Sequence, residues 1–418
     1  MREMKDSGIA WIGAMPRAWK MNTIAQIFLQ VKCKNTGLQE KNLLSLSYGK
    51  VKRKSIDTVE GLLPESFDGY NIIEKDDIVL RLTDLQNDHT SLRVGLAEER
   101  GIITSAYLTI RNRSNFCPKY LYYYLHSFDI AKGFYGMGAG VRQGLNWDGV
   151  KWLKILAPSV PEQERIAAFL DAECAEIDAV LEKTRASIEE YKKLKQAVIT
   201  QAVTKGIRGD RPMKDSGIEW IGEIPAEWDV IRVKQLLKER NERSKEGKEE
   251  PLSMSQKVGL VPTKFLESIP NMASSFVGAK LAYVDDLVFN KLKAHLGVFS
   301  VSRYDGLVSP DYAVYCSTGK SNLKYLEYIF KTPQCIGEFR KKSTGIAAGL
   351  MRLYTEGLFS IYLPYPALSE QEEIAEYLNE KCAGIDALIV KKQQYLIEIE
   401  NYKKSLIYEY VTGKKEVV

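Results

Sequence analysis

The chain has 418 residues, which at roughly 150 residues per domain predicts about two to three domains. Hydrophobic residues make up 45% and charged residues 27%, and no stretch approaches the ~20 consecutive apolar residues of a membrane span. These values exclude a small disulfide-stapled scaffold and predict a soluble protein with no membrane partner. The first residues lack the apolar core of a signal peptide, so we expect a cytoplasmic location.

The cysteines and histidines give no sign of a metal centre. None of the three histidines is spaced from another as in H-x-x-H, and the six cysteines contain no C-x-x-C pair. We therefore expect reduced, buried thiols and no bound metal. The cysteines are Cys33, Cys117, Cys174, Cys316, Cys335 and Cys382.

An internal repeat organises the chain. Residues 4–19 recur as residues 213–228 with 11 of 16 positions identical, and each copy is called a box below. A second echo links residues 158–183 to residues 366–391 at an offset of 208, without a gap. Each copy of the repeat thus contains a box, a long divergent segment and a stretch that starts with P-x-x-x-x-E-Q-x-x-I-A.

Two long helices are predicted, over 162–204 and 370–412. Neither range contains proline, and Gly206 and Gly413 stand where a helix would stop. A helix of 43 residues is about 64 Å long. Apolar residues recur every three or four positions and define one seam on each helix. The seam residues are Ile177, Leu181, Ile188, Tyr191 and Val198 in the first helix, and Ile385, Ile389, Leu396, Ile399 and Leu406 in the second.

A long helix must bury its seam, so we expect the two helices to pair with each other. Lysines interrupt the apolar pattern, at Lys195, Lys392 and Lys403. Because a lysine weakens an apolar seam, the pairing leaves room for a partner protein to complete it.

The divergent segments predict mixed α/β domains that share a fold. Short apolar runs at 76–82 and 285–292 read as equivalent strands, and tyrosine-rich stretches at 118–128 and 323–332 read as equivalent helices. We interpret their aromatic residues as core. The predicted fold class is α+β, with two similar mixed α/β domains joined by two long helices and an internal pseudo-twofold repeat. The predicted boundaries are 1–157, 158–212, 213–365 and 366–418.

Positive charge concentrates in the divergent segments. Their net charges are +4 for 21–157 and +7 for 230–365, while 158–212 and 366–418 carry −1 and −3. A phosphate backbone is attracted to such positive domains, so we infer a nucleic-acid surface on them, with solvated lysines as the alternative.

Basic clusters and amide side chains supply the candidate DNA contacts. Lysine and arginine in the predicted loops 49–54 and 339–345 suit phosphate groups, whereas arginine, glutamine and asparagine can read base edges. A glycine-rich loop at 136–147 has a counterpart at 343–354. The candidate residues are Lys50, Lys52, Arg53, Lys54, Arg81, Arg142, Gln143, Asn146, Asn290, Lys291, Lys293, His295, Arg340, Lys341, Lys342 and Arg352.

Catalytic signatures are missing from the sequence. We find no P-loop, no dinucleotide fingerprint, no G-x-S-x-G elbow and no Asp/Asn-Pro-Pro-aromatic tetrapeptide. The sequence therefore predicts binding rather than catalysis, with no catalytic residue and no cofactor in this chain.

The two boxes and the start of each long helix resemble the specificity subunits of type I restriction-modification systems, and the resemblance spans the whole chain. It implies two target-recognition domains, each contacting one half of a split double-stranded DNA site, with two antiparallel helices as a spacer. It also implies two modification subunits, which carry S-adenosylmethionine and methylate adenine, and restriction subunits that use ATP and Mg²⁺. In that family this subunit catalyses nothing.

Two other interpretations stay open at this point. One is a coiled-coil scaffold or adaptor that does not read DNA, and the other is a remnant DNA methyltransferase-nuclease. Pseudo-twofold placement of two dissimilar domains favours a bipartite, asymmetric site with half-sites roughly 34–36 Å apart.

Overall fold

The computed structural model divides into two compact units. The first unit comprises Met1–Arg185 together with Gln394–Val418, and the second unit is the continuous segment Ala186–Gln393. The structure describes residues 2–55, 66–137, 144–256, 258–266, 275–345 and 351–417.

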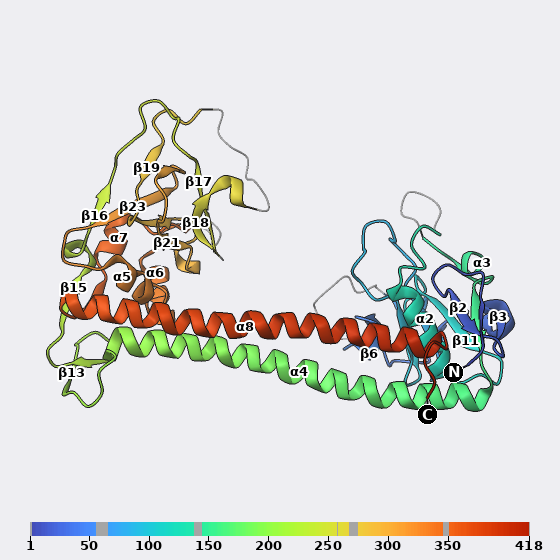
Figure 1. Cartoon of the computed structure of the whole chain (residues 1–418). Coiled ribbons are helices and arrows are strands. Elements are labelled where there is room, and N and C mark those ends of the chain that lie inside the picture. Colours follow the sequence, from blue (N-terminus) through green and yellow to red (C-terminus); the bar gives the residue numbers. More distant parts are fainter. Residues whose placement is uncertain are drawn as a thin grey trace. The chain divides into compact units, whose positions relative to one another are not determined.

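The first unit consists of short strands and one substantial helix ahead of the long helix α4 (Figure 1). Its elements, in chain order, are β1 (Met4–Asp6), β2 (Ala14–Pro16), β3 (Lys20–Thr23), α1 (Ile24–Ile27), β4 (Phe28–Gln30), β5 (Leu44–Ser47), β6 (Lys50–Arg53), β7 (Asn71–Ile73), β8 (Ile78–Leu80), β9 (Val94–Leu96), β10 (Gly101–Ile103), β11 (Leu108–Asn112), α2 (Pro118–Ile130), α3 (Trp147–Val150) and β12 (Lys154–Ala157).

A four-stranded antiparallel sheet with the order β4-β11-β8-β9 forms the centre of this unit. The apolar run of β8 is fully buried, as expected of a central strand. Tyr120 and Tyr124 of α2 belong to the same core cluster as Ile78 and Leu80 of β8. The prediction that the tyrosine-rich stretch is core is therefore confirmed.

The second unit has a corresponding series of elements. They are β13 (Met213–Asp215), β14 (Glu223–Pro225), β15 (Asp229–Arg232), η1 (Val233–Gln235), β16 (Leu237–Arg240), β17 (Leu252–Ser255), β18 (Gly259–Pro262), η2 (Thr263–Phe265), β19 (Lys280–Ala282), β20 (Leu287–Asn290), η3 (Ala294–Leu296), β21 (Phe299–Val301), β22 (Gly306–Val308), β23 (Tyr312–Ser317), α5 (Leu323–Phe330), α6 (Pro333–Lys342), α7 (Thr355–Phe359) and β24 (Tyr362–Tyr365).

The central sheet of the second unit has the order β16-β23-β20-β21, which follows the same connectivity as the sheet of the first unit. Its core differs in composition, because phenylalanines fill it. The rings of Phe289 and Phe299 stack with centroids 4.5 Å apart, and Phe330 meets Phe289 edge-on at 5.7 Å. The same arrangement of strands is thus built from different side chains.

Two long helices complete the chain, α4 (Val160–Lys205) and α8 (Leu368–Val411). Their ends agree with the predicted ranges to within two residues. Gly206 and Gly413 follow them with φ of +76° and +72°, a conformation that stops a helix readily only at glycine. The prediction of two uninterrupted helices with glycine stops is therefore confirmed.

All six cysteines are free, but only half of them fit the expectation of burial. Cys174, Cys335 and Cys382 are buried, whereas Cys33 is exposed. Within the described ranges, none of the helices is both long and apolar enough to cross a membrane.

Candidate nucleic-acid interface

A buried cluster of tryptophan, glutamate and arginine attaches the second box to the start of α8. Nε1 of Trp228 donates a 2.9 Å hydrogen bond to Oε2 of Glu370, and Nη2 of Arg211 lies 2.6 Å from Oε1 of the same carboxylate. The Arg211 and Glu370 side chains are only 9% and 8% exposed. A charge pair this deep is tolerated because each partner satisfies the other.

The first unit repeats this cluster with the first box and α4. Nε1 of Trp19 donates to Oε2 of Glu162 at 3.2 Å, and Arg2 pairs with Glu162 at 2.5 Å. Arg2 also pairs with Glu416 at 3.0 Å, so the segment that follows α8 is joined to the residues just ahead of the first box. The tryptophan of each box and the glutamate of each E-Q pair are therefore partners in the fold.

The glutamine of each E-Q pair ties a long helix to the neighbouring helix. Nε2 of Gln163 donates to the carbonyl of Pro158 at 3.0 Å, and its Oε1 accepts from the backbone N–H of Cys117, just before α2, at 3.0 Å. Gln371 likewise accepts from the backbone N–H of Asn322, just before α5, at 2.9 Å. These bonds satisfy groups that a helix start leaves free, so the repeated motifs serve the architecture.

In the first unit, α4 and α8 lie side by side in opposite directions. Nζ of Lys403 lies 2.5 Å from Oδ1 of Asp178, and Nη2 of Arg185 lies 2.7 Å from Oε1 of Glu400. Moving from Asp178 to Arg185 along α4, the paired residue on α8 moves back from Lys403 to Glu400, as expected of antiparallel helices.

The second unit shows the same relation. Nζ of Lys195 lies 2.6 Å from Oδ2 of Asp386, and the Lys392 ammonium lies over the ring of Tyr191 at 5.6 Å. The three lysines expected to weaken the seam are thus each engaged by a group on the other helix.

The predicted seam residues are buried or half-buried. The buried ones are Ile177, Leu181, Ile188 and Leu406, and the half-buried ones are Tyr191, Val198, Ile385, Ile389, Leu396 and Ile399. Sequence reasoning missed the buried residues toward the outer ends of both helices, although they continue the same periodicity: Ile166, Leu170, Ile199, Val203, Ile374, Leu378 and Ile407.

The first basic cluster lies on a hairpin. Residues Lys50–Arg53 form β6 and pair with β5, with Ser47 opposite Lys50. Tyr48 and Gly49 make the tight turn, both with positive φ. The expectation of a loop at 49–54 was therefore wrong, because the alternating residues Leu44 and Leu46 of β5 bury one face of the hairpin and hold it as sheet.

The charges of this hairpin are partly neutralised. Nε of Arg53 donates to Glu99 at 2.7 Å, and Nζ of Lys50 lies 3.6 Å from Asp178 of α4. The hairpin lysines that are exposed and form no ion pair within the described ranges are Lys52 and Lys54.

Candidates from separate segments meet in the second unit. The backbone N–H of Leu353 donates to the carbonyl of Lys291 at 3.0 Å, and Arg352 lies 3.7 Å from Asp311, whose carbonyl accepts from the Lys291 N–H at 3.3 Å. Asn290 ends β20 directly before this contact. Burial lowers the pKa of Lys291. Asn290, Lys291 and Arg352 therefore form one surface, although 61 positions separate Lys291 from Arg352 in the sequence.

The remaining candidates of the second unit flank this surface. Lys293 precedes η3, His295 lies within it, and α6 packs against η3. Arg340, Lys341 and Lys342 form the last turn of α6, so the expectation of a loop at 339–345 was also wrong for these three. Basic side chains at a helix C-terminus complement its dipole, which gives them a structural reason to be there.

In the first unit, Asn146 caps a helix. Its Oδ1 accepts from the backbone N–H of Gly149 at 3.2 Å at the start of α3. Arg142 and Gln143 lie outside the described residues. Arg81, 33% exposed, pairs with Asp88 at 3.5 Å in the connection between β8 and β9.

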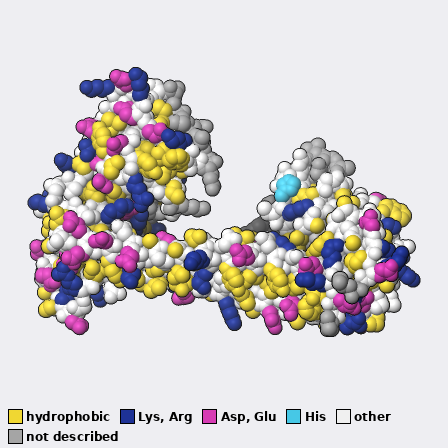
Figure 2. All heavy atoms as spheres, in the orientation of Figure 1, with side chains coloured by type: hydrophobic (Ala, Val, Ile, Leu, Met, Phe, Trp, Pro, Cys, Tyr) yellow, Lys and Arg dark blue, Asp and Glu magenta, His cyan; other side chains and the backbone are white. Residues whose placement is uncertain are grey.

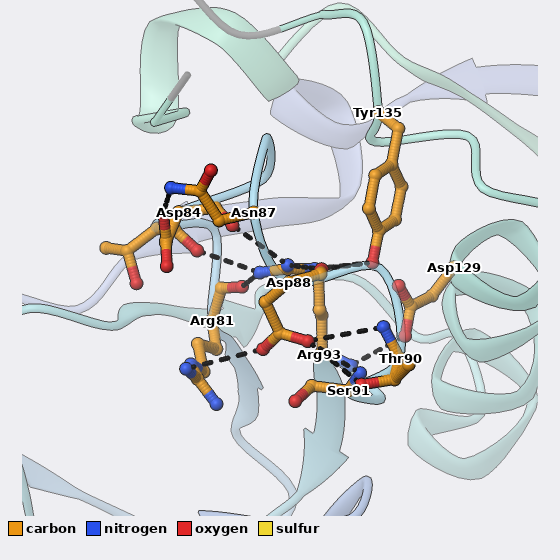
Figure 3. Close-up of polar contacts among 10 residues, drawn as sticks. Arg81, Asp84, Asn87, Asp88, Thr90, Ser91, Arg93, Asp129 and Tyr135 are labelled. Atoms are coloured by element: carbon orange, nitrogen blue, oxygen red, sulfur yellow. Dashed lines mark hydrogen bonds and ion pairs between the residues drawn. The ribbon is translucent and has the colours of Figure 1, made fainter. Parts of the chain in front are cut away.

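That connection, residues 81–93, is the feature that sequence reasoning missed apart from Arg81. The backbone N–H of Leu145 donates to the carbonyl of Leu82 at 2.8 Å, as Leu353 does to Lys291 in the second unit. Figure 3 shows Arg93 extended through the middle of the loop, which curls around it. A sequence does not distinguish a buried arginine from an exposed one, so no pattern in it indicated that Arg93 is buried.

Hydrogen bonds and burial shift the pKa values of two carboxyl groups beside this loop. The side chain and backbone N–H of Ser91 hold the pKa of Asp88 well below its usual range. Burial raises the pKa of Asp129, on α2, to about 6. The loop is therefore strongly polar inside, while its outer residues face solvent.

Figure 2 shows Lys and Arg side chains on both units, intermixed with Asp and Glu on the face that it presents. Within the described part of the chain, no group of three or more His, Cys, Asp or Glu side chains is placed to hold a metal ion. The candidate residues are thus polar and basic side chains on loops, on the β5–β6 hairpin, in η3 and in the last turn of α6.

No protein-family model matches the chain. A putative type I restriction enzyme MjaX specificity subunit of Methanocaldococcus jannaschii is 25% identical over 429 residues, which covers 97% of this chain and 96% of that protein. The type I restriction enzyme MjaVIII specificity subunit of the same organism is 24% identical over 63% of each chain. The EcoDI specificity subunit of Escherichia coli is 22% identical over 63% of this chain and 62% of that protein.

Two solved structures share the fold. A chain from a study of complex assembly and conformational transition in the type I R-M system superimposes with a TM-score of 0.70 at 14% identity, covering 96% of this chain and 99% of that chain. The HsdS subunit from Thermoanaerobacter tengcongensis gives a TM-score of 0.53 at 14% identity, covering 96% and 98%. The chain is therefore similar in sequence, over nearly its whole length, to a curated type I restriction enzyme specificity subunit, and it shares the fold of these two solved structures.

Proposed function

We propose that this chain is the DNA sequence-specificity subunit of a type I restriction-modification complex. The observation that carries the proposal is that the likeness to a named specificity subunit runs through 97% of the chain, and so through both units and both long helices. In this proposal the target-recognition domains lie within 1–157 and 213–365, and the conserved helical segments are 158–212 and 366–418.

Each domain reads one half of a bipartite DNA site. The two central sheets have the same strand order, but the residues that follow equivalent strands differ, with Arg81 after β8 and Asn290 at the end of β20. Because base readout depends on side chains rather than on strand order, two different half-sites are expected. The full site is then asymmetric.

The long helices act as an antiparallel coiled-coil spacer within an internal pseudo-twofold repeat. Support comes from the opposite directions of α4 and α8 within each unit and from the repeated lysine–aspartate pairs. The helices also dock two modification subunits, and restriction subunits join the same complex. S-adenosylmethionine, ATP and Mg²⁺ then belong to those partners, and this chain contributes recognition without catalysis.

The two competing interpretations predict different behaviour. A scaffold that does not read DNA predicts that the complex binds duplex with no loss of affinity between low and physiological salt, whereas phosphate contacts predict a steep loss. A remnant enzyme predicts turnover by the purified chain alone with S-adenosylmethionine, Mg²⁺ and DNA. We expect the salt-dependent loss and no turnover.

The decisive experiment maps methylated adenines in cells that contain the modification subunit, with and without this chain. We expect one bipartite motif that vanishes without the chain. Exchanging residues 21–157 for those of a relative should then change one half-site only. Methylation independent of this chain, or an exchange that changes both half-sites or neither, would overturn the proposal.

A further inference from the structure

The connection between β8 and β9 has the construction of a rigid reading loop. We propose that it carries base-reading residues of the first unit, with Gln86 and Asn87 as readers and Arg93 as the residue that positions them. This inference deepens the proposed function and rests on it.

Arg93 is buried in the middle of this loop, with no exposed surface. Its Nη1 donates to the carbonyls of Arg81 at 3.0 Å and Thr83 at 2.8 Å, and its Nη2 donates to those of Asp84 at 3.4 Å and of Asp88. Burying a charged group is costly unless all its donors are used, and here the guanidinium is satisfied by the loop's own backbone. The loop can therefore adopt few other conformations while Arg93 stays in place.

Groups outside the loop hold Arg93 from the other side. Its Nε donates to the hydroxyl of Tyr135 at 3.0 Å, and that hydroxyl donates to the carbonyl of Asp88 at 3.0 Å. The Arg93 backbone N–H donates to Oδ2 of Asp129 on α2 at 2.6 Å (Figure 3). The loop is thus anchored to the helix that packs on the central sheet.

The two aspartates of the loop do not present free carboxylates. Oδ1 of Asp88 accepts from the backbone N–H of Ser91 at 2.9 Å, and Oδ2 lies 3.5 Å from Nη2 of Arg81. Oδ1 of Asp84 accepts from Nδ2 of Asn87 at 2.8 Å. Because these oxygens are engaged inside the loop, their repulsion of a phosphate backbone is reduced.

Gln86 and Asn87 are the exposed amide side chains of the loop. The Gln86 amide makes no hydrogen bond within the described residues, and Asn87 uses one N–H on Asp84, which leaves its carbonyl oxygen and a second N–H available. An amide that offers a donor and an acceptor together matches N7 and the N6 amino group of adenine in the major groove. The chemistry therefore favours an adenine in this half-site.

The position of the loop supports the same role. Leu145 binds Leu82 through the backbone at the base of this loop, and Leu353 binds Lys291 in the same way at the base of the β20–β21 connection. The residue directly before β9 is Arg93, whereas the residue directly before the equivalent strand β21 is Val298. The buried arginine of the first unit is therefore replaced by a valine at the equivalent position of the second unit. Equivalent loops with different contents are what two different half-sites require.

The test uses the full chain in complex with its modification subunit and DNA libraries that carry every base at each position. For Gln86→Ala and Asn87→Ala we expect discrimination at one or two positions of one half-site to fall about five- to a hundredfold, with the other half-site unchanged. Asn115→Ala, which removes an exposed amide from the connection between β11 and α2, is the matched control and should change nothing.

Arg93→Lys keeps the charge but loses the fork of donors, so it should relax the same positions while the other half-site is still read, which shows that the chain is folded. This inference alone would be overturned if the wild-type complex methylates a defined site but neither Gln86→Ala nor Asn87→Ala changes its discrimination between bases. A wild-type complex without sequence preference would overturn the proposed function as well.

Discussion

Nζ of Lys195 lies 2.6 Å from Oδ2 of Asp386, and the same two positions of the repeat meet again as Lys403 and Asp178. The offset of 208 that relates the sequence copies converts Asp178 into Asp386 and Lys195 into Lys403. Each pair joins α4 to α8 within one unit. Each copy of the repeat thus contributes one lysine and one aspartate, and the two resulting ion pairs align α4 with α8, one in each unit.

These pairs should align the helices more than they stabilise them. The Lys195 and Asp386 side chains are 31% and 54% exposed, so Lys195→Ala is expected to cost only about 0.5 kcal/mol of unfolding free energy. A double-mutant cycle with Asp386→Ala, measured by urea unfolding, should give a coupling of similar size. A coupling above about 2 kcal/mol would mean that the pair is a main source of stability.

The spacer role predicts that matched insertions change the distance between half-sites. Seven residues added after Lys183 in α4 and seven after Glu398 in α8 keep the two lysine–aspartate pairs, at the loss of the exposed Arg185–Glu400 pair, and lengthen the helices by about 10 Å. That length is about three base pairs of DNA. Mapping methylated adenines should show two unchanged half-sites with a longer spacer.

An insertion in α4 alone is the control for this experiment. It would shift Asp178 and Lys195 relative to each other but leave Lys403 and Asp386 in place, so both ion pairs could not form together. We expect loss of site-specific methylation from that variant. A matched variant whose spacer stays the same would contradict the spacer role.

Glu370 is expected to be essential for the stability of the second unit. Glu370→Ala leaves Arg211 buried without its partner and Trp228 without its acceptor, at a cost of about 3 kcal/mol or more. Glu190→Ala removes a partner of Lys193 from an ion pair in which both side chains are over 70% exposed, so it should change stability by less than about 0.5 kcal/mol. Urea unfolding monitored by fluorescence would compare the two, and equal effects would rule out the buried cluster as an anchor.

His126 on α2 makes the first unit sensitive to acid. Burial lowers the pKa of His126 to about 4, and its Nδ1 is buried without a hydrogen-bond partner among the described residues. In the unfolded chain His126 takes up a proton near pH 6.5, whereas in the folded chain it does so only near pH 4. The contribution of neutral His126 to the unfolding free energy is therefore complete above pH 6.5 and is lost as the pH falls from 6.5 to 4.

The size of this effect is about 2 kcal/mol at pH 5. His126→Phe keeps a ring beside Tyr122, whose ring lies 5.5 Å from that of His126, and removes the titrating group. Unfolding free energies measured from pH 7 to pH 5 should then fall less steeply for the variant than for the wild type. Parallel pH profiles would show that another group is responsible.

Much of the architecture is readable from the sequence because it depends on local periodicity. The ends of both long helices follow from proline-free ranges and from Gly206 and Gly413, and burial of Tyr120 follows from its place on an apolar helix face. The repeat itself is visible in the boxes. What the boxes do, with Trp228 hydrogen-bonded to Glu370 142 positions away, is visible only in the structure.

The candidate interface was predicted less well, for a physical reason. Reading loops are defined by contacts between distant segments, such as Leu145 with Leu82, and no periodicity records such contacts. The basic runs beginning at Lys50 and Arg340 were expected to form loops, yet an apolar strand face holds one as sheet and α6 includes the other. Arg93 was missed because its burial depends on carbonyl groups that every residue possesses.

The two units differ in the order in which translation supplies their parts. Ala186–Gln393 is one continuous stretch, whereas the first unit combines Met1–Arg185 with Gln394–Val418, which follows the second unit in the sequence. The hydroxyl of Tyr120 donates to the carbonyl of Val411 at 3.3 Å, and Arg2 pairs with Glu416, so these contacts form only after the whole second unit has been made. A stop codon placed after Gln393 would therefore harm the unit encoded first and spare the one encoded second.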